Sequence, residues 1–403
     1  METIVLKFGG TSVGTTERIS AVADIIKTAC SEAPPVVVVS AMSGETNRLI
    51  DLAKSFGAEA NKREFDALVS TGEQVSASLV SIALNQLGFK AKSLSAAQFG
   101  MKTTSNFSRA KILELDKDII FKTIEDGYIP IITGFQGVTS EGDTTTMGRG
   151  GSDTTAVAIA AAIKSKRCDI YTDVDGIYTT DPRIVSNAKK LDSINIEEML
   201  ELAGQGAKVM QIRAVEFANK YKVLVRVLSS FDSGSGTLIL QEEEGMEDAV
   251  ITGIASQKDQ TKFTLHGVVD TPGIASGILS PVSDAGIEVD VIVQNVSVSG
   301  KTDFTFTVSN SDRAEVESVL TKKMQGISYD ELIINEGIGK VSLVGVGMRS
   351  HAGIASTAFD ALADAGINIQ MISTSEIKIT IVISGHQLEE AVKTLHAAFN
   401  LGD

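Results

Sequence analysis

The sequence predicts an α/β protein: a large domain with a mainly parallel sheet sandwiched by helices, followed by two small α+β modules. Three observations support this prediction. Residues 36–39 are four consecutive valines, which is typical of a strand buried on both faces of a parallel sheet. Short apolar strands alternate with helical patterns over the first 240 residues. After an acidic segment at 241–248, a pattern of residues repeats at a constant offset of 80.

Length and composition limit the class of protein. A chain of 403 residues is too long for one ordinary core, so we expect two or three domains. A net charge of −15 argues against a nucleic-acid partner, which needs a basic face. The cysteines, Cys30 and Cys168, match no metal or redox spacing and suit a reducing compartment. Because the N-terminus has no charged leader and no long apolar run, we expect a cytoplasmic protein without a signal peptide or membrane span.

The elements of the large domain follow from apolar spacing. Residues 4–8 form a short apolar run, and Ile19, Val22, Ala23 and Ile26 have the spacing of an amphipathic helix over 16–28. The same reasoning predicts, in order, a strand at 35–40, helices at 46–55 and 64–85, a strand at 90–95, a helix at 115–126, a strand at 129–133, a hairpin arm at 143–146, a helix at 156–163, a strand at 169–172, helices at 196–203 and 207–221, and a strand at 223–227.

The repeat in the last third predicts two similar modules. Gly267 matches Gly347, and the same offset aligns 273–276 with 353–356 and 284–287 with 364–367. Each copy reads as strand, glycine-containing turn, helix, strand, turn, strand. Two copies are too few for a solenoid, so we expect two small α+β modules packed on each other. A chance match of common helix and strand patterns is the alternative.

A glycine-rich turn at 148–153 (GRGGSD) leads directly into a helix start. Glycines allow close backbone approach, and the free N–H groups of a first helical turn attract anions. Arg149 adds a planar fork suited to a carboxylate or phosphate. Ser152 is a candidate helix cap, and Asp153 is able to hold a proton or a metal. The local physics leaves the anion unspecified.

A second glycine-rich turn, 7–12 (KFGGTS), lies between the first strand and the first helix. It is not a Walker loop, because Lys7 precedes the glycines. Exposed backbone N–H groups and the Lys7 ammonium nevertheless suit charge on a transferred phosphoryl group. A purely structural turn is the alternative. We predict that the two turns face each other across a phosphoryl-transfer site.

Polar residues after other strands are further candidates. In an open parallel sheet, ligands bind at the carboxyl ends of strands, and residues 40–47 follow such a strand. Gly72 weakens a helical pattern, and one reason for it is that Glu73 points into a cleft towards an ammonium group. The glycines at 133–137 permit backbone approach to a ligand. Each stretch also has a structural alternative: a turn with a helix cap at 40–47, a solvent-facing glutamate at Glu73, and a hairpin turn at 133–137.

Two later stretches suit a nucleotide. Residues 169–183 are polar after a strand and are able to hold a base and ribose, with Arg183 near phosphate, although Asp-Gly and Asp-Pro also mark plain turns. Residues 206–209 open a predicted helix, where Lys208 reaches phosphate or remains a solvated surface lysine. None of the four histidines has a nucleophile partner in a recognisable motif, so a catalytic triad or zinc site is not supported.

Together these motifs resemble the aspartokinase family. The resemblance rests on 7–12, 70–73, 148–153, 171–183 and 206–209, in this order over nearly the whole chain. The two C-terminal modules look like the paired ferredoxin-like ACT regulatory domains of that family, and the large domain looks like the amino-acid-kinase fold. The chain departs from some relatives at 210–213 (MQIR), where they carry Leu-His-Pro, which leaves the subclass open.

The resemblance implies transfer of the γ-phosphate of ATP, with Mg²⁺, to the β-carboxylate of L-aspartate. The product is 4-phospho-L-aspartate, in the first step of lysine, threonine and methionine biosynthesis through diaminopimelate. The carboxylate is already a nucleophile, so catalysis rests on positioning and electrostatics. No protein ligand to a metal is assigned. The residues carried over are Lys7, Asp153 and Lys208 for catalysis; Thr46, Glu73, Phe135, Arg149, Gly150, Gly151 and Ser152 for aspartate; and Lys7, Phe8, Gly9, Gly10, Thr172, Asp173, Tyr178, Arg183, Lys208 and Val209 for ATP.

The ACT resemblance implies feedback by lysine, threonine or both, and a homo-oligomer, at least a dimer, formed through these modules. We expect a kinase domain at 1–240, a linker at 241–248 and ACT domains at 249–330 and 331–403. Since the first module is often inserted into the second in this family, the strand at 249–255 is a candidate for either. The implied effector contacts are Asp270, Thr271, Gly273, Ile274, Ala275, Gln294 and Asn295, with Asn368, Ile369, Ser373, Thr374 and Ser375 from the second copy.

Two other functions stay open at this point. A kinase of the same fold acting on another carboxylate, such as acetylglutamate, is one. An amino-acid sensor with an inactive kinase domain is the other, and intact Lys7, Glu73, Arg149 and Asp153 count against it. The chain ends at Asp403, so we expect no fused homoserine dehydrogenase domain. The sequence leaves open which amino acid inhibits, whether inhibition is concerted, and whether an internal start yields a separate regulatory subunit.

Overall fold

The computed structural model describes residues 2–57, 61–207, 209–241, 250–296, 300–323 and 327–402. Most of the predicted linker at 241–248, and Lys208, lie outside these residues. The chain divides into two compact units. The first comprises Met1–Tyr178, Lys190–Gly204 and Lys208–Gly245, and the second comprises Thr179–Lys189, Gln205–Ala207 and Met246–Asp403.

An eight-stranded sheet forms the centre of the first unit, in the order β10-β12-β11-β9-β1-β2-β6-β3. All its pairings are parallel except β11 with β12, which confirms the predicted mainly parallel sheet. The strands are β1 (Ile4–Phe8), β2 (Pro35–Val39), β3 (Ala91–Leu94), β6 (Ile129–Thr133), β9 (Arg167–Thr172), β10 (Ser193–Asn195), β11 (Val225–Ser229) and β12 (Thr237–Leu240).

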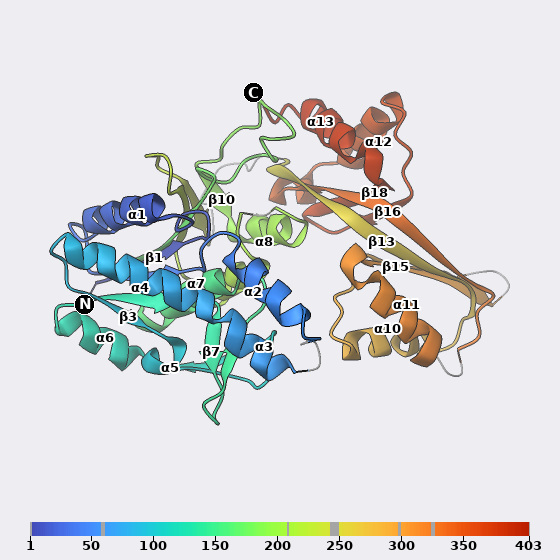
Figure 1. The fold of residues 1–403 in the computed structure, drawn as a ribbon. Helices are drawn as coiled ribbons and strands as arrows, with labels where there is room; N and C mark the ends of the chain where they lie inside the picture. Colours follow the sequence, from blue (N-terminus) through green and yellow to red (C-terminus); the bar gives the residue numbers. More distant parts are fainter. Residues whose placement is uncertain are drawn as a thin grey trace. The chain divides into compact units, whose positions relative to one another are not determined.

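Helices cover this sheet, and Figure 1 shows α1 and α4 lying along one face. Ile4, Leu6 and Phe8 of β1 point to that face and join the core with residues of both helices. Lys7 alternates to the opposite face, because successive strand residues point in opposite directions. The helices are α1 (Thr16–Ala29), α2 (Glu45–Lys54), α3 (Lys62–Val69), α4 (Thr71–Gln86), α5 (Ala96–Phe99), α6 (Lys117–Glu125), α7 (Gly151–Ile163), α8 (Ile196–Gly204) and α9 (Ile212–Tyr221).

A small second sheet, in the order β5-β4-β7-β8, completes the first unit. Its strands are only three or four residues long, too short for apolar alternation to identify most of them: β4 (Met101–Thr103), β5 (Ile112–Leu115), β7 (Gln136–Val138) and β8 (Thr144–Thr146). The hairpin arm predicted at 143–146 corresponds to β8.

Four helix predictions were wrong in their limits. The helix predicted at 156–163 begins five residues earlier, at Gly151. The helix predicted at 64–85 is two helices separated at Ser70. The helix predicted from 115 begins at Lys117, because Asp116 is its N-cap and the Asp116 side chain accepts a hydrogen bond from Asp118 N–H. The helix predicted from 207 begins at Ile212, where Gln211 is the N-cap and its side chain accepts from Ile212 N–H. The described residues among 206–209 therefore do not open a helix, and apolar spacing alone did not reveal the later capping residue.

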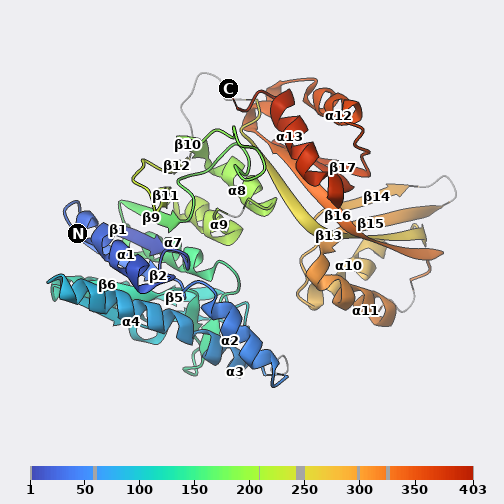
Figure 2. The ribbon, with the colours of Figure 1, turned by 45° about the horizontal axis from the view of Figure 1, so that its top comes forward.

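A six-stranded antiparallel sheet forms the centre of the second unit, in the order β14-β15-β13-β16-β18-β17. Figure 2 shows α10 with α11, and α12 with α13, as two separate pairs. The strands are β13 (Gly253–Val269), β14 (Ile292–Val296), β15 (Lys301–Ser309), β16 (Glu331–Val344), β17 (Met371–Thr374) and β18 (Lys378–Ser384); the helices are α10 (Ile274–Asp284), α11 (Arg313–Lys323), α12 (Ile354–Asp364) and α13 (Leu388–Ala398), with short 3-10 turns η2 (Asn310–Asp312), η3 (Val346–Ser350) and η4 (Gly385–Gln387).

The predicted repeat is present in this unit. The order β13-α10-β14-β15-α11 recurs as β16-α12-β17-β18-α13, with a closing helix that the pattern did not reveal. Gly273 and Gly353 occupy equivalent N-cap positions, each with φ of 95°, a conformation that favours glycine. Ile254 of β13 packs in the core with α12 and α13, whereas Phe263 of the same strand packs with α10 and α11. β13 therefore serves both copies.

One helical stretch among the described residues, Lys62–Gln86, is long and apolar enough to cross a membrane by length and composition alone. Of its most apolar 18 residues, 50% are buried inside the protein, as in a core helix.

Candidate active site

The turn after β1 lies against the turn after β2. Gly9 N–H donates to the Tyr171 carbonyl at the end of β9, at 3.1 Å. A side chain at Gly10 would place a Cβ 2.9 Å from the Ala41 carbonyl oxygen, so only glycine allows this approach. The glycines of 7–12 therefore bring the backbones that follow three neighbouring strands together at the carboxyl edge of the sheet.

Lys7 reaches the other glycine-rich turn. Its Nζ lies 2.5 Å from Oδ1 of Asp153, and each side chain is 10% exposed. Asp153 is in the first turn of α7, where a carboxylate also complements the partial positive charge of the helix N-terminus. The two turns singled out in the sequence thus meet through an ion pair on the α7 face of the sheet.

Close packing shapes the start of α7. Gly150, with φ of 70°, is the N-cap residue and Gly151 is the first helical residue. Ser152 therefore lies inside the helix, and its prediction as a helix cap was wrong because the chain needs the left-handed conformation two residues earlier, at Gly150. Ser152 is buried, and a Cβ at Gly134 would lie 2.6 Å from its Oγ.

Phe135 packs beside this helix start in a left-handed conformation, with φ of 69°. Its N–H donates to Thr155 Oγ1 at 3.2 Å, and its carbonyl accepts from Met147 N–H at 2.9 Å. Such backbone strain is uncommon for an aromatic residue and clusters at functional sites. Arg149, by contrast, is exposed at the turn.

Glu73 is a buried carboxyl group beside the β2 turn. Its Oε1 accepts from Ala41 N–H at 3.1 Å, while Oε2 is buried without a hydrogen-bond partner. Burial raises the pKa of Glu73 to about 8, against the opposing effect of the Ala41 N–H. Gly72 has a steric role, because a Cβ there would lie 2.8 Å from the Ala41 Cβ. Thr46, in the first turn of α2, is half-buried.

Several of the predicted nucleotide residues follow β9 in the first unit. Thr172 ends the strand and donates to Asp173 Oδ1 at 3.1 Å. Tyr178 donates to Asp175 Oδ1 at 2.7 Å, and Lys190 Nζ lies 3.3 Å from Asp175 Oδ2. The Asp175 carboxylate raises the pKa of Tyr178 to about 12, and the Tyr178 hydroxyl lowers the pKa of Asp175. The sequence did not single out Lys190.

The remaining predicted nucleotide residues are not all placed in the site. Arg183 belongs to the second unit, where its guanidinium donates to Asp181 at 2.9 and 2.8 Å. In the same segment Thr179 Oγ1 lies 3.0 Å from His396 Nε2 of α13, and Val185 packs in the core around α12 and α13. Lys208 lies outside the described residues, and Val209 lies in a turn of the first unit.

Two pairs of predicted effector residues, Gln294 with Thr374 and Asn295 with Ser375, occupy equivalent places in the two copies. A cavity of about 480 Å³ in the second copy is lined by Gly353, Ile354, Ala355, Thr374 and Ser375 among others. At the offset of 80 these residues match five predicted in the first copy, which are Gly273, Ile274, Ala275, Gln294 and Asn295. Asp270 and Thr271 precede α10, and Ser373 is on β17. Asn368 and Ile369 are not among the residues lining the cavity.

The described residues include no cluster of three or more His, Cys, Asp or Glu able to hold a metal ion. Asp153 Oδ1 is buried without a hydrogen bond apart from its ion pair with Lys7. A single carboxylate oxygen fits Mg²⁺, which proteins hold through one or two carboxylates together with water and substrate phosphates.

Comparison with known proteins decides the family. The model of the amino acid kinase family matches residues 2–229, and that of an ACT domain matches residues 341–399. The aspartate kinase of Pseudomonas fluorescens (strain SBW25) is 55% identical over 405 residues, covering 100% of this chain and 98% of that protein. The aspartokinase of Helicobacter pylori (strain ATCC 700392 / 26695) is 48% identical over 406 residues, covering 99% of each. The chain belongs to the aspartate kinases.

Solved aspartokinases share the fold of this aspartate kinase. The structure of E. coli aspartokinase III in complex with aspartate and ADP gives a TM-score of 0.84 at 29% identity, covering 98% of this chain and 99% of that chain. The same E. coli enzyme in complex with lysine and aspartate gives a TM-score of 0.75 at 28% identity, covering 100% of both chains. This aspartate kinase is thus a phosphotransferase with an ACT regulatory domain.

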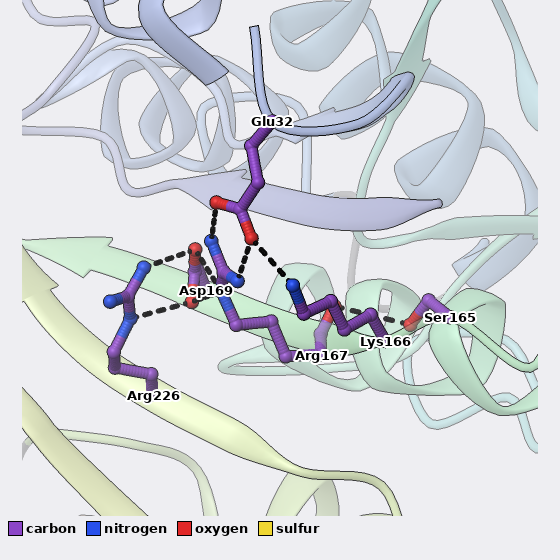
Figure 3. A network of polar contacts seen from close by, with 6 residues as sticks. All are labelled: Glu32, Ser165, Lys166, Arg167, Asp169 and Arg226. Atoms are coloured by element: carbon purple, nitrogen blue, oxygen red, sulfur yellow. Dashed lines mark hydrogen bonds and ion pairs between the residues drawn. The ribbon is translucent and has the colours of Figure 1, made fainter. Parts of the chain in front are cut away.

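A network of ion pairs around β9 was not identified from the sequence of this aspartate kinase. Figure 3 shows Asp169 of β9 accepting from both Arg167 and Arg226, while Glu32 pairs with Arg167 and Lys166. Asp169 is 1% exposed, at 3.0 Å from Arg167 Nε and 2.8 Å from Arg226 Nη2. The Arg167 guanidinium lowers the pKa of Glu32 to about 2. The network ties β9, which ends at Thr172, to β11 and to the loop before β2.

Proposed function

We propose that this aspartate kinase transfers the γ-phosphoryl group of ATP to the β-carboxylate of L-aspartate, giving 4-phospho-L-aspartate. The contact of Lys7 with Asp153 carries this proposal, because it joins a phosphate-binding turn to an acceptor-binding turn. The E. coli relative crystallised with aspartate and ADP supports the same pair of ligands.

On the phosphate side, Lys7 and the turn formed by Phe8, Gly9 and Gly10 hold the transferred group. Their fixed positive charge stabilises the negative charge that spreads over the phosphoryl oxygens in the transition state. Asp153 would lie beside a bound Mg²⁺, which would supply neutralisation of the phosphate charge. Lys208 completes this side in the proposal. Thr172, Asp173, Tyr178 and Val209, all in the first unit, surround the nucleotide.

On the acceptor side, the α7 turn holds aspartate. Arg149 grips a carboxylate through its planar fork, and Gly150, Gly151 and Ser152 supply polar groups at the helix start. Glu73 receives the α-ammonium at its unpartnered Oε2. Thr46 and Phe135 complete the pocket. Because the acceptor is already a carboxylate, no residue has to abstract a proton from it.

The ACT domain makes this an enzyme that responds to amino acids. We propose inhibition by lysine, threonine or both, bound at the residues before and within the first turn of α10, at Gln294 and Asn295 of β14, and at residues 368–369 and 373–375 of the second copy. The E. coli relative in complex with lysine and aspartate supports lysine as one effector. The proposed domain limits are 1–240, 249–330 and 331–403, and the proposed assembly is a homo-oligomer through the ACT domains. We place the enzyme in the cytoplasm, at the first step of lysine, threonine and methionine biosynthesis.

Turnover assays test the proposal directly. The full chain with ATP and Mg²⁺ should release ADP in the presence of aspartate, and acetylglutamate should give only the background rate. Lys7→Ala should lower kcat by about a hundredfold or more, since it removes a transition-state donor, and should leave lysine or threonine binding by the second unit unchanged. Turnover with acetylglutamate but not aspartate would overturn the substrate, and amino-acid binding without any turnover would indicate a sensor.

A further inference from the structure

Asp66 is a buried carboxylate that the site described above does not use. It lies on α3 with 0% exposure and accepts four hydrogen bonds. Its Oδ2 accepts from the N–H groups of Ser108 and Thr146, at 2.8 and 2.7 Å. Its Oδ1 accepts from the hydroxyls of the same two residues, at 3.0 and 2.9 Å. One side chain thus fixes the backbone of two distant segments.

Both segments support the acceptor turn. Thr146 comes directly before Met147 and the turn at 148–153. Ser108, held at φ of 68°, places its carbonyl against Gly148, where an added Cβ would lie 3.2 Å away. Ala110 N–H also donates to the Thr146 carbonyl at 2.9 Å. A left-handed serine is a strained conformation that persists only where its surroundings hold it, and the bonds from Asp66 do so.

Helix α9 holds the other side of the same turn. Arg213 donates to the carbonyls of Met147 and Ala110, at 3.3 and 3.0 Å. Gln211 donates to the Arg149 carbonyl at 2.8 Å, and a Cβ at Gly150 would lie 2.4 Å from its Cγ. These two residues belong to the segment at 210–213 where the chain departs from some relatives. Every carbonyl named here lies within or beside the acceptor turn.

We infer that Asp66 and Arg213 are positioning residues that hold the turn at 148–153 in its aspartate-binding conformation. Neither is placed at the substrate; each acts through the backbone that carries Arg149 and Ser152. The inference rests on the proposed role of this turn as the aspartate site. A site displaced by about 1 Å loses up to about a hundredfold in efficiency, so the clamp has a kinetic consequence.

Four single-residue variants of the full chain test the clamp. Asp66→Ala removes all four hydrogen bonds. Asp66→Asn keeps one oxygen for the two backbone N–H groups and turns its amide towards the two hydroxyls, which are able to accept. Arg213→Met removes the clamp from the α9 side. Ile120→Ala, a buried core residue of α6, serves as a destabilised control that removes none of the hydrogen bonds named above. KM for aspartate, KM for ATP and kcat are measured for each.

The expected result is a KM for aspartate raised about tenfold or more in Asp66→Ala, with the KM for ATP within about twofold of the wild type. Asp66→Asn should stay within about threefold of the wild type, and Arg213→Met should resemble Asp66→Ala. Where Asp66→Ala does not fold, Arg213→Met decides in its place. A KM for aspartate in Asp66→Ala or Arg213→Met no higher than in Ile120→Ala, or an equal rise for both substrates, would overturn the inference.

Arg149→Ala separates this inference from the proposed function. If Arg149→Ala raises the KM for aspartate but the clamp variants do not, the clamp is wrong and the acceptor turn stands. If Arg149→Ala leaves the KM for aspartate unchanged, the proposed aspartate site fails, and the clamp inference fails with it.

Discussion

Glu73 is predicted to make aspartate binding depend steeply on pH. In the free enzyme its burial raises the pKa to about 8, so at pH 7 only about one carboxyl group in ten is ionised. The proposed role needs the carboxylate, because only the ionised form pairs with an ammonium group. The apparent affinity is therefore reduced by the fraction of enzyme in the ionised form.

The magnitude follows from that fraction. Between pH 6 and 7 the ionised fraction rises about tenfold, between pH 7 and 8 about fivefold, and above pH 8 it approaches its limit. The KM for aspartate should fall by the same factors over this range. Glu73→Gln should raise the KM and make it nearly independent of pH from 6 to 8, because glutamine does not titrate.

The assay is ADP release at saturating ATP, with aspartate varied from pH 6 to 8.5 for the wild type and Glu73→Gln. A KM for aspartate that stays flat over this range in the wild type, or an equal slope in Glu73→Gln, would refute the reasoning. ATP affinity in the same buffers is the internal control.

The same pKa has a consequence for stability. Because the folded-state pKa of Glu73 is raised above its usual 4.5, the folded protein binds more protons than the unfolded chain between about pH 4.5 and 8. The contribution of Glu73 to the free energy of unfolding is therefore fully present below pH 4.5 and is lost as pH rises through 8. The complete loss is on the order of 5 kcal/mol. Glu73→Gln should remove this loss, as measured by urea unfolding at several pH values.

Three further predictions concern the packing and charges around the site. Gly72→Ala should destabilise by about 1–3 kcal/mol and raise the KM for aspartate, because its Cβ meets Ala41 at 2.8 Å; adding Ala41→Gly should restore both in kinetic and unfolding assays. Asp169→Ala should lower Tm by about 6–12 °C. Breaking a buried ion pair costs about 3 kcal/mol at the low end, and the low end applies because Arg167 still pairs with Glu32. Asp169→Asn should lower Tm by less. Because its pKa is lowered to about 2, Glu32 should add stability that is present above about pH 4.5 and lost as pH falls through 2. The amount is below about 1 kcal/mol, since the Glu32 side chain is 39% exposed. In thermal melts, Glu32→Gln should make Tm less dependent on pH between 4.5 and 2.

Local patterns predicted much of the fold. The buried valines of β2 and the glycine-rich turns after β1 and before α7 are signals carried by adjacent residues, and the structure places those turns in contact through Lys7 and Asp153. The repeat at an offset of 80 revealed the second unit because the same glycines recur at equivalent helix starts.

Other parts of the site depend on contacts between residues far apart in the sequence. Nothing near Asp66 indicates that it will accept bonds from residues 42 and 80 positions away. Arg213 reaches a carbonyl 103 positions away, and the helix on which it lies begins five residues later than apolar spacing predicted. The steric reason for Gly72 likewise becomes visible only when Ala41 is beside it.

The identity of the product tests the central claim most directly. The full chain, incubated with ATP, Mg²⁺ and aspartate, should produce an acyl phosphate visible by ³¹P NMR in proportion to ADP. Hydroxylamine should convert this product to the hydroxamate of the aspartate β-carboxylate, and Lys7→Ala should form both products at least about a hundredfold more slowly. ADP release without an acyl phosphate, or an acyl phosphate formed from acetylglutamate in place of aspartate, would contradict the account.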